Sequence, residues 1–110
     1  MDVFISAVQR TGDLAGVFEY DDSDAVATAY FYLYRTQDKN SGEILGAVHI
    51  RSGPWNIREE DIGVRWDMDE RRVGLFIFGT LWAVFDADTC QGYGGGYGKN
   101  SQPEIPWDEA

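Results

Sequence analysis

The sequence from Val73 to Asp86 reads VGLFIFGTLWAVFD, and this stretch decides the fold. Two apolar runs, Val73 to Phe78 and Leu81 to Asp86, flank Gly79, which can adopt the positive φ of a tight turn. Both runs are apolar on both faces, whereas a strand with one exposed face alternates apolar and polar residues. We therefore expect a β-hairpin at the centre of a sheet.

The register of this hairpin depends on its turn. A two-residue loop at positions 78–79 would place Phe76 near Leu81 and Leu75 near Trp82. The first loop residue is a phenylalanine, which tolerates a positive φ far less well than glycine does. The residues therefore leave the turn type open.

Outward from the hairpin, the earlier sequence alternates apolar and polar residues with a period close to two. The predicted strands are Val3–Gln9, Leu14–Tyr20, Ala25–Arg35, Glu43–Ile50 and Ile62–Trp66, with polar turns between most of them and a long loop over residues 51–61. No long stretch has a helical period. The pattern predicts an all-β protein of about seven strands, either a small antiparallel β-sandwich or a curled barrel-like sheet.

We expect a single β domain over residues 1–88 and a flexible Gly-rich C-terminal tail over residues 89–110. Residues 92–98 read GYGGGYG, and glycines make ordering of the backbone costly in entropy. Trp107 is the residue that could dock this tail onto the domain.

The charge of the chain narrows the class of partner. Nine Lys and Arg residues against nineteen Asp and Glu residues give a net charge of −10, which disfavours nucleic acid and anionic membranes. The charge favours a basic protein partner, with self-association as the other possibility. Because 44% of the residues are hydrophobic, the chain can form one core.

Targeting and redox features point to the cytoplasm. Cys90 is the single cysteine, which excludes an internal disulfide. The first residues have neither the basic region nor the apolar run of a signal peptide, and no stretch approaches the about 18 apolar residues of a membrane span.

Catalytic residues are sparse. His49 is the single histidine, and on an alternating strand such a residue is more often structural than catalytic. No G-x-S-x-G, Walker or H-E-x-x-H motif is present. We therefore expect a protein that is not an enzyme and needs no cofactor.

Acidic turn residues suggest an alternative role in calcium binding. If the strands form a simple meander, one end of the sheet gathers Asp38, Asp67, Asp69, Asp86 and Asp88. Such oxygens are the ligands that Ca²⁺ takes, about six to eight at a time. Solvated turn residues that maintain solubility are the alternative interpretation.

Aromatic residues form the other candidate site. Tyr30, Tyr32 and Tyr34 share one face of a strand, and Trp55 lies in the long polar loop. Tyrosine and tryptophan are enriched in protein interfaces and can also stack on sugar rings. Cross-strand aromatic ladders that only stabilise a sheet are the alternative.

Several of these stretches resemble a known family. Residues 75–86, followed by Gly92-Tyr93, resemble the C-terminal signature of small bacterial proteins known as domain of unknown function 2251. Residues 28–34, 47–50 and 64–66 are similar to its earlier strands. The resemblance covers most of residues 10–93 and implies a bacterial, cytoplasmic, β-rich domain, without any established activity.

Together these features favour a non-catalytic protein-binding domain, an acidic binder of the inhibitor or immunity-protein kind. Its partner surface would contain Tyr30, Tyr32, Tyr34 and Trp55. The alternative is a β module that binds Ca²⁺ or carbohydrate.

Overall fold

The computed structural model describes residues 2–10, 12–22, 27–36, 42–97, 105 and 107. These residues form eight β-strands and one short 3-10 helix. The elements are β1 (Val3–Val8), β2 (Leu14–Asp21), β3 (Thr28–Arg35), β4 (Glu43–Ser52), η1 (Glu59–Asp61), β5 (Ile62–Trp66), β6 (Arg72–Ile77), β7 (Thr80–Asp86) and β8 (Gly92–Gly94).

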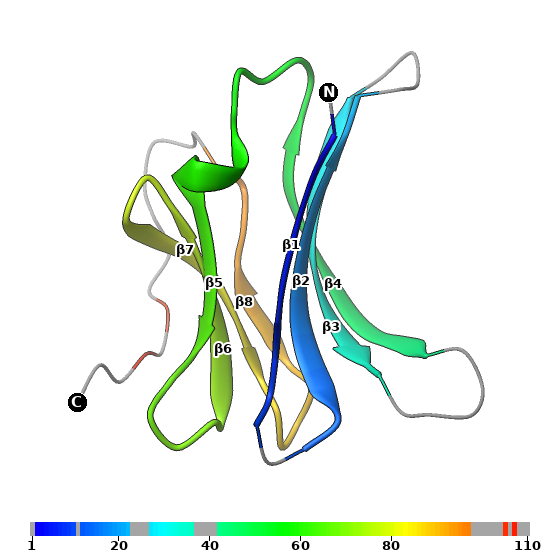
Figure 1. Ribbon diagram of the computed structural model, residues 1–110, viewed down its shortest axis with the longest axis vertical. Coiled ribbons are helices and arrows are strands. Elements are labelled where there is room, and N and C mark those ends of the chain that lie inside the picture. Colours follow the sequence, from blue (N-terminus) through cyan, green and yellow to red (C-terminus); the bar gives the residue numbers. More distant parts are fainter. Residues whose placement is uncertain are drawn as a thin grey trace.

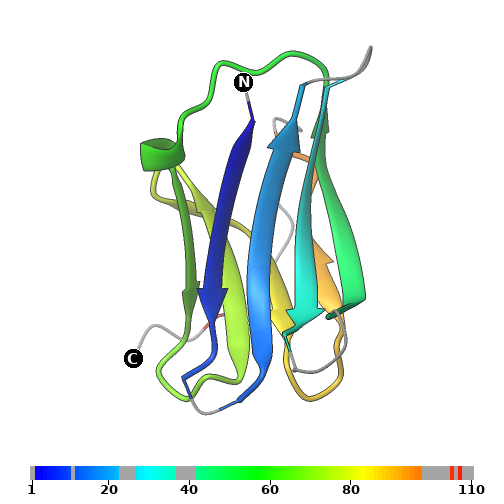
Figure 2. The same ribbon diagram turned by 45° about the vertical axis from the view of Figure 1, so that its right-hand side comes forward.

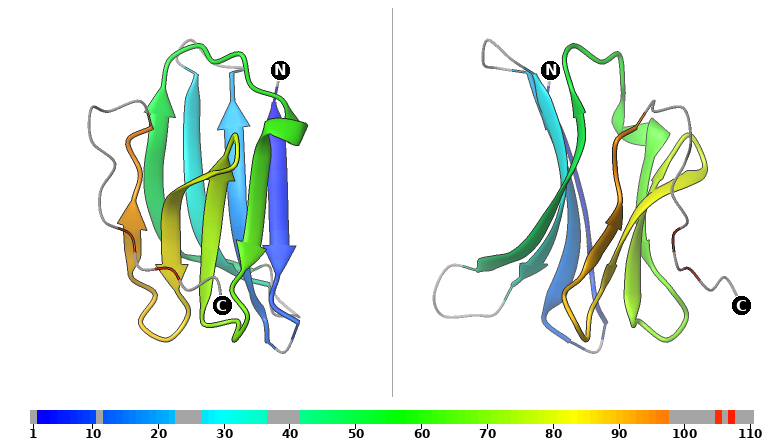
Figure 3. Two further views of the ribbon diagram at one scale, coloured as in Figure 1. Left: turned by 90° about the vertical axis from the view of Figure 1, so that its left-hand side faces the viewer. Right: turned by 180° about the vertical axis from the view of Figure 1, so that it is seen from behind.

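The strands form two four-stranded antiparallel sheets, and this confirms the predicted β-sandwich (Figures 1 and 2). Sheet A has the order β1-β2-β3-β4 and sheet B the order β5-β6-β7-β8, so pairing is sequential within each sheet. The chain crosses once from sheet A to sheet B, through residues 53–61. β1 lies beside β5 and β4 beside β8 (Figure 3).

The hairpin of β6 and β7 occupies the centre of sheet B, as its two-sided hydrophobicity predicts. Phe76 lies opposite Leu81 as expected, but Leu75 pairs with Ala83 and not with Trp82. A register shift between Leu75 and Phe76 causes this difference, because it places one extra residue on β7.

The turn of this hairpin has two residues with positive φ. The φ angles are 50° at Phe78 and 81° at Gly79, which is the pattern of a type I′ turn. This geometry matches the twist of the flanking strands, and Phe78 adopts it although it is not a glycine.

The eighth strand lies in the region expected to be a tail. In β8, Gly92 pairs with Phe85 and Gly94 with Ala83, so sheet B extends beyond Asp88. A Cβ at Gly92 would lie 2.8 Å from the ring of Phe85, so only glycine fits without a shift. Trp107, at the end of the described chain, packs edge-on against Phe76 with ring centroids 5.5 Å apart.

The core lies between the sheets. Phe31 of sheet A and Phe85 of sheet B are fully buried, and their ring centroids lie 5.4 Å apart. At Gly16 the sheets approach so closely that a Cβ would lie 2.5 Å from Cγ2 of Val73. The alternation seen in the sequence therefore places one face of each strand in this core.

Both long sides of the sandwich are tied by polar contacts. On the β1 side, Nε1 of Trp66 donates to the carbonyl of Ala7 at 2.9 Å. On the β4 side, the backbone N–H groups of Gly96 and Tyr97 donate to the carbonyls of His49 and Ile50 at 3.2 and 2.8 Å. The two sheets are therefore joined along both of these sides, and their outer faces point away from the core.

Candidate functional site

The outer face of sheet A carries the predicted tyrosines. Strand register arranges the outward side chains of this sheet in three rows, each running from β1 to β4. The rows are Phe4-Glu19-Tyr30-His49, Ser6-Val17-Tyr32-Ala47 and Val8-Ala15-Tyr34-Ile44.

Small side chains along β2 make this face a groove. Ala15 and Val17 are only 2% and 9% exposed although they point away from the core, because larger neighbours stand on both sides. Phe4 and Val8 of β1 line one side, and Tyr32 and Tyr34 of β3 line the other. The hollow has a volume of about 380 Å³ and also contacts Ser6, Glu19, Thr36 and Ile44. We call it the sheet A groove.

The groove exposes apolar surface to solvent. Phe4, Val8 and Ile44 are 59%, 56% and 57% exposed, and all three lie at its rim. Among the described residues, the other large hydrophobic side chains as exposed as these are Met68 and Phe78. Sheet A also curves away from sheet B toward the start of β4, so its outer face is concave (Figures 1 and 3). A concave apolar face of this kind is typical of a binding surface.

The three tyrosines are half-buried and form a stripe along β3, of which Tyr32 and Tyr34 line the groove. The rings of Tyr30 and Tyr32 stack with centroids 5.9 Å apart and planes 17° apart, and the ring of His49 meets Tyr30 edge-on at 5.2 Å. Burial raises the pKa of Tyr32, and charge repulsion from Glu19 and from ionised Tyr30 raises it further. The described tail residue Trp107 packs against Phe76 of sheet B and not against this stripe.

Trp55, which is predicted from the sequence to share a partner surface with the tyrosines, does not lie on this face. It is half-buried at one end of the sandwich, where its ring meets Phe18, Tyr20 and Tyr97 at centroid distances of 6.3, 6.0 and 4.9 Å. Its backbone N–H donates to Oη of Tyr20 at 2.9 Å. Trp55 therefore closes the core and does not join the tyrosines.

The remaining groove residues were not singled out from the sequence. Phe4, Val8 and Ile44 belong to strands whose alternation is visible, but their grouping with Glu19 requires the register of three strand pairs. The signal that could have found them is the apolar character of positions 4, 8, 15 and 17 on the faces opposite the core.

In two of the turns predicted to bind calcium, an aspartate side chain accepts hydrogen bonds from backbone N–H groups of the same turn. Oδ1 of Asp67 accepts from the N–H groups of Arg71 and Arg72 at 2.9 and 3.2 Å, and Oδ1 of Asp86 accepts from Asp88 and Thr89 at 2.8 and 3.1 Å.

The other residues predicted as calcium ligands are Asp69, Asp88 and Asp38. Asp69 and Asp88 are exposed, and Asp38 lies outside the described residues. In the described ranges, no three His, Cys, Asp or Glu side chains converge as a metal site would need.

The single histidine forms a hydrogen bond with a serine. Nε2 of His49 lies 2.8 Å from Oγ of Ser52, and both side chains are exposed. The described residues supply no acid that orients the other ring nitrogen, which an activated serine would require. This pair is best described as a surface hydrogen bond beside the tyrosine stripe.

The fold and the groove define a small β-sandwich with one open, concave, aromatic sheet face. A family model described as an uncharacterized protein conserved in bacteria (DUF2251) matches residues 1–109, and the chain belongs to this family. Neither a curated protein nor a solved structure matches the chain. In the described residues, no helix has the length and apolar character needed to span a membrane.

Proposed function

We propose that this protein is a non-catalytic binding domain that engages a partner protein through the sheet A groove. One observation carries the proposal: exposed Phe4, Val8 and Ile44 line a hollow whose floor is apolar, and Tyr32 and Tyr34 form one of its sides. Large apolar side chains at a hollowed surface are stabilised when a partner removes them from water. Tyrosine adds contact area at low entropic cost and keeps a polar tip.

The charge of the chain supports a basic partner. At −10, the protein attracts a cationic surface over long range and speeds its association. The same charge opposes pairing of two copies, since each would bring −10 to the interface. An acidic binder that neutralises a basic protein fits these properties.

The ring geometry favours a protein over a sugar as the ligand. Tyr30 and Tyr32 stack on each other, so their facing ring surfaces are already occupied. A sugar ring needs a flat aromatic face to stack on, whereas a protein side chain also packs against ring edges.

Affinity capture from a bacterial host of the protein tests the proposal. Three immobilised proteins are compared: the wild type, a groove variant with Phe4→Ser and Ile44→Ser, and a control variant with Met68→Ser and Phe78→Ser. Both variants remove two large apolar side chains that are more than half exposed. Circular dichroism and thermal melting establish that all three proteins are folded.

The expected result is a stoichiometric host protein that the wild type and the control retain and the groove variant loses. A single Tyr32→Ala variant should weaken capture in the same direction. Retention by the groove variant at the wild-type level would place the interface elsewhere and overturn the proposal.

A further inference from the structure

We infer that the occupant of the sheet A groove is an amphipathic α-helix of the partner, which carries a lysine or arginine placed over Glu19. This inference rests on the proposed function and specifies the partner of the same surface. It follows from the position of Glu19, from the backbone chemistry of the groove and from the dimensions of the groove.

Glu19 is a charged group in an otherwise apolar and aromatic setting. It lies on β2 in line with the floor residues Val17 and Ala15, between Phe4 on one side and Tyr30 on the other. Within the described part of the chain, no cationic side chain pairs with it. Arg35, at the far end of the groove, lies 3.9 Å from both Asp13 and Glu43.

A partner that covers the groove must therefore compensate the negative charge of Glu19. Covering the floor removes water from the carboxylate, and an unpaired charge removed from water is costly. A lysine or arginine from the partner would restore the balance and contribute a charge-assisted hydrogen bond. Charge complementarity thus requires a cation at this end of the groove, with apolar side chains over Val17 and Ala15.

The backbone of the groove favours a helix over an extended segment. Over residues 15–20, β2 is paired with β1 on one side and with β3 on the other, so this part of the floor offers no free N–H or C=O group. An extended segment lying on this face would leave its own backbone groups unpaired, whereas a helix satisfies them internally. Helix on sheet is also a common way to bury a sheet face.

The dimensions agree with a helix. The walls, β1 and β3, are two strand spacings apart, about 9.6 Å between backbones, so a single row of side chains fits between them, and a helix that lies across the top of the face supplies such a row. Glu19, Val17 and Ala15 follow one another at about 6.6 Å along the strand. A helix rises about 1.5 Å per residue. With its cation over Glu19, the side chain about four residues away therefore lies over Val17, and the one about eight residues away lies over Ala15.

A second copy of this chain does not supply such a segment from its described residues. Their one helix is η1, a single 3-10 turn of three acidic residues. The charge of −10 that a second copy would bring also opposes this occupant, so the inferred occupant is a different, basic protein.

Selection from a phage-displayed library of amphipathic helices, held on a fixed helical scaffold and randomised on one face, tests the inference. Selection is run on the wild type, on Glu19→Lys and on Asp69→Lys, which makes the same charge change at an exposed position of the turn between β5 and β6. The affinities of the selected helices for each protein are then measured by fluorescence anisotropy.

The wild type and Asp69→Lys should both select helices with Lys or Arg about one turn from an apolar residue. Glu19→Lys should lower the affinity for these helices by about tenfold or more. Selection on Glu19→Lys itself should yield helices with Asp or Glu at the same position.

Selected helices that tolerate Glu19→Lys but lose binding to the Phe4→Ser, Ile44→Ser variant would overturn the role of Glu19 and leave the groove as the binding surface. Helices that bind the groove variant as tightly as the wild type would contradict the proposed function itself. A failure to select any helix, with capture of a host protein still dependent on the groove, would overturn the helical occupant alone.

Discussion

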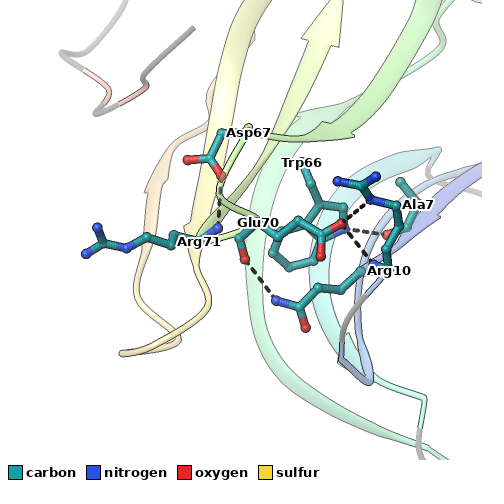
Figure 4. A network of polar contacts seen from close by, with 7 residues as sticks. Ala7, Arg10, Trp66, Asp67, Glu70 and Arg71 are labelled. Carbon is teal, nitrogen blue, oxygen red and sulfur yellow. Dashed lines mark hydrogen bonds and ion pairs between the residues drawn. The ribbon is translucent and has the colours of Figure 1, made fainter. Parts of the chain in front are cut away.

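Arg10 donates two hydrogen bonds to one carboxylate oxygen of Glu70, from its backbone N–H at 2.9 Å and from Nε at 3.1 Å. Arg10 follows β1 in sheet A, and Glu70 precedes β6 in sheet B, so this contact joins the two sheets (Figure 4). Gln9 adds a bond from its side-chain amide to the Glu70 carbonyl at 2.8 Å. Glu70 is buried and adopts a φ of 56°, which the surrounding contacts hold in place.

Replacing Glu70 should destabilise the sandwich more than replacing Arg10. Glu70→Ala removes the acceptor of a partly buried N–H, and we expect a loss of about 1–3 kcal/mol in the free energy of unfolding. Arg10→Ala keeps that N–H, and because the arginine side chain is 83% exposed, its loss should cost less than about 1 kcal/mol. Urea denaturation of both variants measures the difference. Equal losses would show that the ion pair, and not the backbone bond, holds the sheets.

The strands could be predicted from the sequence because each buries one face, and a period of two is visible in any single strand. β8 could not be predicted in this way. Its glycines have no side chains to reveal a pattern, and their place in the sheet depends on the ring of Phe85, against which a Cβ at Gly92 would clash. The register shift at Leu75 was also hidden, since a bulge leaves the composition of a strand unchanged.

The candidate site could be predicted in part for the same reason. Tyr30, Tyr32 and Tyr34 belong to one strand, so alternation alone places them on one face. The position of Trp55 depends on Tyr20 and Tyr97, which are distant in the sequence, and a single-sequence argument could not place it against the core. Glu19 was missed because its position beside Tyr30 follows only from the pairing of β2 with β3.

Substitution of Phe78 should stabilise the hairpin. Phe78 has a φ of 50° and its side chain is 58% exposed, so a residue that tolerates this φ loses little packing. Phe78→Asn creates the Asn-Gly pair that type I′ turns prefer. We expect a gain of about 1 kcal/mol and a rise in melting temperature of about 4 °C. Gly79→Ala, at a φ of 81°, should lower the melting temperature. A lower melting temperature for Phe78→Asn would mean that the phenyl ring contributes more than its exposure indicates.

Protonation of Asp86 should make the protein less stable in acid. Burial acts to raise the pKa of Asp86, but hydrogen bonds from the N–H groups of Thr89 and Asp88 and the charge of Arg72 outweigh it and lower the pKa. A carboxyl group whose pKa is lower in the folded state stabilises the fold above its unfolded pKa of about 3.9. That contribution is lost as the pH falls through the folded pKa.

The acid effect can be isolated with Asp86→Asn, which keeps an oxygen acceptor but carries no charge. Unfolding in urea at several pH values should show the largest difference between wild type and variant near pH 7 and a shrinking difference below about pH 4. A difference that stays constant over this range would assign the stabilisation to hydrogen bonding alone and contradict the prediction.

The ionisation of Tyr32 reports on Glu19 within the groove. Burial raises the pKa of Tyr32 above about 10, with further contributions from Glu19 and Tyr30, so the neutral phenol is favoured in the folded state. Its contribution to stability is therefore complete below the unfolded pKa and declines as the pH rises through the folded pKa. Glu19→Gln should lower the pKa of Tyr32 toward its ordinary value. Absorbance titration of tyrosinate measures this shift when each protein is compared with its Tyr32→Phe counterpart, which removes the signal of the other tyrosines. An unchanged pKa of Tyr32 in Glu19→Gln would show that the charge of Glu19 does not act on this tyrosine. The negative potential assigned to that end of the groove would then be wrong.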